Sequence, residues 1–285
     1  MVRRIHLVLG FILALLIGFG VGIVHTKNSG SNTTLTIASH GEVGSPASIS
    51  VTGSVHASDA GVKMLVQGGG RVIDEGTQLL YQAASYSYTS NGGLVNNNHD
   101  QFYAGQADKK KLGTIAEAIL GKTEGSRIAV VDPDDSAKNT EIVVIDLLPT
   151  TVQGQMKAFA GTVPFPGITV GANNRPTLGA TGQAIPSLAV SELIAGKGAQ
   201  ITQNDAIFAN YVLVDANGAV LEDTWNNPQP AYIEVNKVFA GMRDGLLDQR
   251  IGSRVALAIP AQNAQGNRDI YAIVDILAIA NKAED

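Results

Sequence analysis

Two stretches of the chain are nearly the same: GSRIAVV at residues 125–131 and GSRVALA at residues 252–258. Each is followed by a second apolar run, at residues 142–148 in the first copy and 270–277 in the second. Short runs rich in Val and Ile, bounded by Gly, Pro, Asn and Asp, are typical of β-strands. The pattern therefore predicts a duplicated, strand-rich domain.

A helix-like piece precedes each Gly-Ser-Arg motif, at residues 114–120 and 238–247. In the second piece, three apolar residues are spaced for one helical face: Phe239, Met242 and Leu246. In the first piece, Thr114 and Glu117 have the spacing of a capping box, which predicts a helix that begins at Thr114. Each copy is thus expected to lay one short helix across several antiparallel strands.

The repeat also matches glycine-rich turns further upstream, Gly68-Gly69-Gly70 and Gly196-Lys197-Gly198, so that each copy spans about a hundred residues, the usual size of a domain. Polar, non-periodic residues before the first copy favour a spacer, and prolines with many glycines between the copies favour a linker. The expected division is an N-terminal segment at 1–26, a flexible spacer at 27–45, a first domain at 46–150, a linker at 151–185 and a second domain at 186–285.

The composition places the chain among folded, turn-rich proteins. Of 285 residues, 45% are hydrophobic and 16% charged, 32 are glycine, and aromatic residues make up only 5%. This mixture favours β or α+β domains over helical bundles. The net charge is −5 and no basic run is longer than that of residues 109–111, so no nucleic-acid partner is expected.

The residue types present exclude several kinds of catalysis. The chain has no cysteine, which removes thiol nucleophiles and thiolate metal sites. Its five histidines all lie in the first hundred residues: His6, His25, His40, His56 and His99. The second copy therefore cannot form its own Ser-His-Asp set or a histidine-based metal site, and we expect neither a metal nor a cofactor.

The N-terminus carries a candidate membrane segment. Arg3 and Arg4 precede an unbroken run of apolar residues and glycines at residues 7–24, close to the ~20 residues that span a bilayer. The flanking arginines predict a cytoplasmic N-terminus, and hence a single-pass signal anchor with the remaining chain outside the cytoplasm. A cleaved signal peptide, which would make the protein secreted, is the alternative.

The second copy contains a series of features in a recognisable order: a Gly-x-Gly turn at 196–198, a strand with an internal tyrosine at 206–214, an Asn-Gly turn at 217–218, Val-Phe-x-Gly-Met at 238–242, Gly-Ser-Arg at 252–254, Ile-Pro at 259–260 and Val-Asp-Ile-Leu at 274–277. Over roughly residues 187–280 it resembles FKBP-type peptidyl-prolyl cis–trans isomerases, most closely the exported, tandem-domain forms of high-GC Gram-positive bacteria. The first copy resembles the same family more weakly, over roughly residues 60–148.

The resemblance implies an α+β fold of two tandem half-barrels, each an antiparallel sheet wrapped on one short helix, with an apolar cup as the active site. Tyr211 matches the family's pocket tyrosine and Glu222 its pocket aspartate; both are implied catalytic residues. The implied substrate-binding residues are Leu221, Val238, Phe239, Met242, Ile259 and Ala272. In the first copy, Gln82 falls at or next to the tyrosine position, and the pocket region is polar, with Asn96, Asn97 and Asn98.

The family's reaction is compatible with the residues present. The barrier to rotation about an X–Pro bond, about 18–20 kcal/mol, comes from amide resonance, so its catalysis needs no nucleophile, metal or base. A dry apolar cup favours the less polar twisted amide, and the Tyr211 hydroxyl can hold the substrate carbonyl. The resemblance thus implies an isomerase that acts on proline-containing segments of unfolded exported proteins.

Three departures from the family pattern keep other functions open. Met242 stands at the family's tryptophan, while Leu221 and Ala272 stand where the family has phenylalanine. The cup is therefore expected to be shallower and less aromatic. A non-catalytic chaperone or peptide-binding module at the cell envelope is the main alternative, and a purely structural envelope protein is a third.

Overall fold

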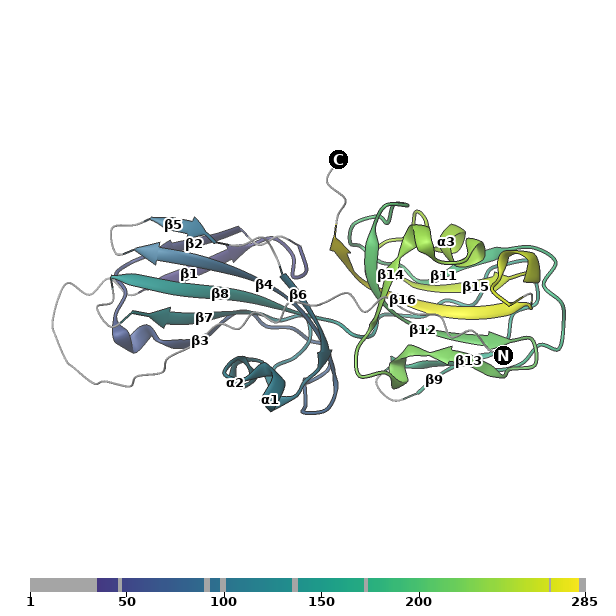
Figure 1. Cartoon of the computed structure of the whole chain (residues 1–285), viewed down its shortest axis with the longest axis horizontal. Coiled ribbons are helices and arrows are strands. Elements are labelled where there is room, and N and C mark those ends of the chain that lie inside the picture. The colour runs from purple at the N-terminus through teal and green to yellow at the C-terminus, as the bar shows by residue number, and fades with distance from the viewer. Residues whose placement is uncertain are drawn as a thin grey trace.

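The computed structural model describes residues 35–45, 48–89, 93–97, 101–134, 138–171, 174–266 and 268–281. It shows two sheet-rich halves arranged end to end along the long axis of the molecule (Figure 1). The expected signal anchor at residues 1–26 lies outside the described residues. Within the described ranges, no helix combines the length and the apolar character needed to cross a membrane.

The first half is built on a six-stranded sheet with the order β3-β7-β8-β4-β5, in which β6 also pairs with β4. All of its pairs are antiparallel. Its elements are β3 (Gly61–Val66), β4 (Gln78–Thr89), β5 (Leu94–Asn96), β6 (Gln101–Gln106), α1 (Lys109–Leu112), α2 (Ile115–Ile119), β7 (Arg127–Pro133) and β8 (Asn139–Leu148).

The second half repeats this topology with the order β11-β15-β16-β12-β13, in which β14 also pairs with β12. Its elements are β11 (Ala189–Ile194), β12 (Ala206–Asp215), β13 (Val220–Asp223), η3 (Thr224–Asn226), β14 (Ala231–Glu234), η4 (Val235–Lys237), α3 (Ala240–Leu246), β15 (Arg254–Ile259), η5 (Ala261–Asn263) and β16 (Ile270–Asn281). The expected α+β architecture, with two antiparallel sheets and few helices, is confirmed.

Glycines allow α3 to lie close against the second sheet, over β15 (Figure 1). A Cβ atom on Gly241 would overlap the side chain of Ile259, and one on Gly245 would lie 2.6 Å from Leu257 Cδ2. The same helix buries Met242 and Leu246 against the sheet. The glycines that weaken the helical pattern in the sequence are therefore what permits the packing.

The matched glycine turns have the same role in both copies. A Cβ atom on Gly68 would overlap the backbone carbonyl of Glu124, and one on Gly196 would overlap that of Ile251. In both cases the partner lies immediately before the Gly-Ser-Arg motif. The repeat seen in the sequence is thus a repeat of backbone geometry.

Two segments expected to be connectors are instead β-hairpins. β1 (Thr36–His40) pairs with β2 (Ser48–Thr52), so the prediction of a flexible spacer across 27–45 is wrong for its last part. Apolar residues of this segment pack on the outer face of the first sheet, the face away from the helices. They include Leu35, Ile37, Ile49, Val51 and Val55.

The stretch at residues 151–185 covers the second sheet in the same way and is not a free linker. It contains the hairpin of β9 (Ile168–Val170) and β10 (Pro176–Leu178). Val163 and Ile185 are buried in the apolar cluster on the face of the second sheet that points away from α3. The ring of Phe165 contacts that of Tyr271 edge-on, with centroids 5.4 Å apart. Each repeat therefore begins one hairpin earlier than the sequence indicated.

The arginine of each Gly-Ser-Arg motif anchors these hairpins. Arg127 is fully buried, pairs with Asp146 at 2.6 Å, and donates to backbone carbonyls of the β1–β2 turn. Arg254 is equally buried, pairs with Asp275 at 2.6 Å, and donates to the carbonyl of Asn174 in the β9–β10 turn. The carboxylate and carbonyl partners of each guanidinium group offset part of the cost of burying its charge.

The helical region of the first copy differs from the expectation. Residues 109–111 form most of α1, and the side chain of Asp108 caps that helix by accepting from the amides of Lys110 and Lys111. Thr114 makes no side-chain cap bond and already has helical backbone angles. The predicted capping box is therefore wrong: α1 ends at its cap residue Gly113, which has a φ of 57°, and Thr114 enters α2 with helical angles and no side-chain cap.

Candidate functional site

The face of the second sheet against which α3 packs forms the candidate site. Strand alternation directs Tyr211 of β12 to this face, while its neighbour Asn210 points to the opposite face. One apolar cluster contains six of the eight residues implied by the resemblance, with Val238 and Phe239 partly buried at its margin. The buried four are Tyr211, Met242, Ile259 and Ala272.

Glu222 joins the site through a hydrogen bond. The β12–β13 register places Glu222 opposite Leu213, and the Tyr211 hydroxyl donates to Glu222 Oε1 at 2.7 Å. Burial raises the pKa of Tyr211, and the charge of Glu222 and the hydrogen bond to it raise it further. The hydroxyl therefore keeps its proton at neutral pH and remains a hydrogen-bond donor.

Three of the residues expected to line the cup are covered. Met242 is 2% exposed, and Ile259 and Ala272 are fully buried. These three residues therefore present almost no surface to a ligand. The accessible apolar surface comes from Val238 and Phe239, which have extended backbone angles and precede α3; α3 thus begins later than the expected residue 238.

Leu221 does not join this cluster. It lies on the edge strand β13 with 39% of its surface exposed. The structure therefore brings together seven of the eight predicted residues, and leaves Leu221 at the rim.

The described residues contain no group of three or more His, Asp or Glu side chains placed to hold a metal ion. What the cup offers is an apolar surface beside a protonated phenol backed by a carboxylate. This arrangement can hold an apolar ring, exclude water and donate one hydrogen bond.

The equivalent site in the first copy has lost these features. The strand registers place Ala83 where the second copy has Tyr211, and Asp132 where it has Ile259. Gln82 is next to the tyrosine position, as expected, and is aligned with Asn210. The 127-residue spacing of the Gly-Ser-Arg motifs places Lys111 at the position of Val238.

Polar groups occupy the first cup instead. Asp132 lies opposite Glu141 on the neighbouring strand, and burial, with the charge of Glu141, raises the pKa of Asp132. Ser85 donates to Glu141 at 2.8 Å, and the Asn97 amide lies 3.3 Å from the Ser85 hydroxyl. Asn98 lies outside the described residues. An apolar ring would have to desolvate these groups, so the first cup is unsuited to one.

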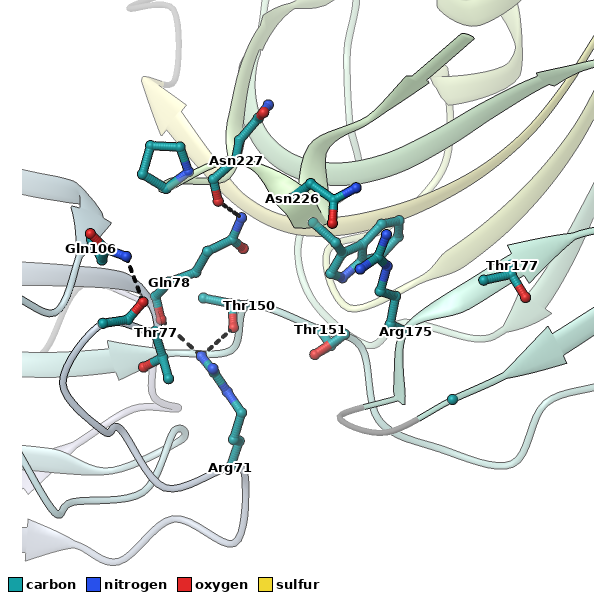
Figure 2. Close-up of a pocket in the computed structure, with 14 residues that line it drawn as sticks. Arg71, Thr77, Gln78, Gln106, Thr150, Thr151, Arg175, Thr177, Asn226 and Asn227 are labelled. Atoms are coloured by element: carbon teal, nitrogen blue, oxygen red, sulfur yellow. Dashed lines mark hydrogen bonds between the residues drawn. The ribbon is translucent and has the colours of Figure 1, made fainter. Parts of the chain in front are cut away.

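The sequence did not reveal a set of polar contacts between the two halves. A cleft of about 1010 Å³ lies at their boundary, and Figure 2 shows Gln78 of the first half bonded to Asn227 of the second. Gln78 also bonds to Asn210. A buried asparagine inside an apolar strand requires hydrogen-bond partners. Asn210 was therefore the one residue whose sequence context could have indicated these contacts. Its partner Gln78 is 132 residues away along the chain.

No protein-family model matches the chain. A curated protein of Corynebacterium glutamicum, named a probable FK506-binding protein, is 27% identical over 107 residues, which cover 34% of this chain and 91% of that protein.

Solved structures give weaker likenesses. Escherichia coli FkpA is 19% identical over 40% of this chain and 53% of its own, with a TM-score of 0.31. The three FKBP domains of wheat FKBP73 are 13% identical over 80% of this chain and 98% of their own, with a TM-score of 0.30. Likenesses of this size do not establish a shared fold. The curated relative, which matches a third of the chain, supports the resemblance to FKBP-type proteins that the sequence motifs indicate.

Proposed function

We propose that this protein is an FKBP-type peptidyl-prolyl cis–trans isomerase whose active site is the cup of the second half. The observation that carries the proposal is the Tyr211–Glu222 hydrogen bond of 2.7 Å at the margin of an apolar cup. The curated similarity to a probable FK506-binding protein supports it. The first half, with its polar cup, acts as a non-catalytic partner domain.

In the proposed mechanism, the proline ring of a substrate packs against Phe239 and Val238. The Tyr211 hydroxyl donates to a carbonyl of the bound peptide, in exchange with its bond to Glu222. Removing water from the X–Pro amide favours the twisted state, in which resonance and charge separation are reduced. No covalent bond forms or breaks.

The natural substrates in this proposal are proline-containing segments of unfolded exported proteins. This part rests on the N-terminal sequence, where residues 7–24 predict a signal anchor or signal peptide. The cell membrane, with the folded halves on its outer side, is the corresponding proposed location.

The test is cis–trans exchange in a short X–Pro peptide, measured by NMR with catalytic amounts of the full chain. We expect acceleration by the unaltered protein, and loss of about 90% or more of it in Phe239→Ala and in Tyr211→Phe, which remove the apolar wall and the donor. Tyr88→Phe is the matched control, since it removes a buried hydroxyl bond, to Gly53 O at 2.8 Å, far from the cup.

Each result of this test is decisive for the proposal. Equal acceleration by folded Tyr211→Phe, Phe239→Ala and Tyr88→Phe would show that the site is elsewhere. No acceleration by the unaltered protein, with peptide resonances that still shift, would identify a peptide-binding module. The replacement of pocket aromatics by Met242 and Ala272 is the observation that favours this second candidate.

A further inference from the structure

The interface between the halves reaches the proposed site from behind. Apolar residues of both halves form one cluster there, and the rings of Phe102 and Phe208 lie 5.7 Å apart. The cluster includes Leu80 and Leu148 from the first half and Leu277 from the second. The two halves are therefore docked over a continuous apolar contact, beside the polar cleft of Figure 2.

Gln78, at the start of β4, crosses this interface. Its amide nitrogen donates to the carbonyls of Thr224 at 2.9 Å and Asn227 at 2.8 Å, which bracket η3. Its amide oxygen accepts from Asn210 Nδ2 at 2.8 Å. The second half thus engages both the donor nitrogen and the acceptor oxygen of the Gln78 side chain.

The groups that Gln78 contacts lead directly to Tyr211. Asn210 and Thr224 are fully buried, and the Thr224 hydroxyl donates to Asn210 Oδ1 at 2.9 Å. The same hydroxyl accepts from the backbone amide of Tyr211 at 2.8 Å. Thr224 also follows Glu222 by only two residues, so that its position determines where the β13 carboxylate can lie.

Other polar side chains at the cleft are also hydrogen-bonded at the boundary between the halves. Arg71 donates to the Gln78 carbonyl at 2.8 Å and to Thr150 Oγ1 at 2.7 Å, and pairs with Glu124 at 2.8 Å. Asn210 donates to the Thr150 carbonyl at 2.8 Å. The polar groups at the cleft therefore hold the two halves in one arrangement.

We propose that Gln78 is a positioning residue: the first half holds η3 through Gln78 and so fixes Tyr211 and Glu222 in the second half. Gln78 lies on the opposite side of the sheet from the cup and touches no substrate. The catalytic part of this inference rests on the proposed isomerase function, whereas the positioning itself does not.

Amide hydrogen exchange in the full chain tests the positioning directly. In Gln78→Ala, we expect the amides of Tyr211 and Asn227 to exchange about tenfold faster, since the bonds that hold η3 are lost. Gln78→Glu keeps the acceptor for Asn210 but loses the two donors, and should show the faster exchange as well. Gln106→Ala is the matched control, because the Gln106 side chain lines the same cleft and donates to the Gly76 carbonyl at 2.6 Å, within the first half.

Exchange rates at Tyr211 and Asn227 that stay the same in both Gln78 variants would overturn the inference. With isomerase activity present, the variants should lower kcat about three- to tenfold with little change in KM, because the apolar walls that bind the substrate are untouched. A reduction confined to KM would contradict a positioning role. Absence of activity in the unaltered protein would refute the proposed function, while the exchange pattern would still decide the role of Gln78.

Discussion

The difference between the two cups comes from a few residues. Tyr211, Val238 and Ile259 in the second copy correspond to Ala83, Lys111 and Asp132 in the first. The polar character of the first cup was predicted from Gln82 and from the asparagines at 96–98, whereas the charged residues Lys111 and Asp132 were not identified as part of it. The sequence could not predict that Met242, Ile259 and Ala272 are covered, since exposure depends on how closely α3 approaches the sheet.

Tyr81 of the first copy provides a test by pH. Its ring stacks on that of Tyr103, with centroids 5.0 Å apart, and burial, with a contribution from Tyr103, raises the pKa of Tyr81 from 10.0 to about 12. Above pH 10 the unfolded chain ionises this phenol and the folded chain does not. The stability contributed by Tyr81 is therefore complete below pH 10 and is lost as the pH rises toward 12.

Urea unfolding of the full chain between pH 8 and 11.5 measures this effect. Other tyrosines also titrate, but Tyr81→Phe should reduce the decline of unfolding free energy by up to about 1.4 kcal/mol per pH unit. Below pH 9 the two proteins should show the same pH dependence. Parallel curves up to pH 11.5 would mean that Tyr81 is not buried as described.

At the scale of elements, the long strands and the helix α3 could be predicted, and the pairing of short strands into hairpins could not. β9 and β10 have three residues each, and Ile168–Val170 is recognisable as β-like, but so short a segment does not show its partner. α1 was not predicted because its three consecutive lysines show no apolar periodicity, although Asp108 is a normal N-cap residue. The roles of Arg127 and Arg254 depend on turns that lie 80 or more residues away, and no local pattern shows them.

The glycine turn before β4 offers a test at this scale. A Cβ atom on Gly68 would overlap the backbone around Glu124, whereas one on Gly69 would meet nothing within 4 Å. We expect Gly68→Ala to lower the unfolding free energy by about 1–3 kcal/mol and the adjacent Gly69→Ala to change it by less than about 0.5 kcal/mol. Thermal unfolding of both variants measures the difference; similar values for the two would contradict the close approach of this turn to the Gly-Ser-Arg motif.

For the whole molecule, the sequence predicted two copies in tandem but not their contact. The interface joins residues that are more than a hundred positions apart, such as Gln78 with Thr224 and with Asn227. Contacts of this kind leave no periodic signal in either segment. The molecule is one joined unit, in which a first copy with a polar cup supports a second copy with an apolar one.

The central claim is that the two copies differ in function because their cups differ. The most direct measurement is NMR cis–trans exchange of an X–Pro peptide with the unaltered chain and two aligned variants, Val238→Lys and Lys111→Val. Val238 is partly exposed at the second cup, and Lys111, which the spacing of the Gly-Ser-Arg motifs aligns with Val238, is exposed in α1. We predict that Val238→Lys lowers the acceleration at least tenfold and that Lys111→Val leaves it unchanged; the opposite pattern, or equal loss in both, would contradict the account.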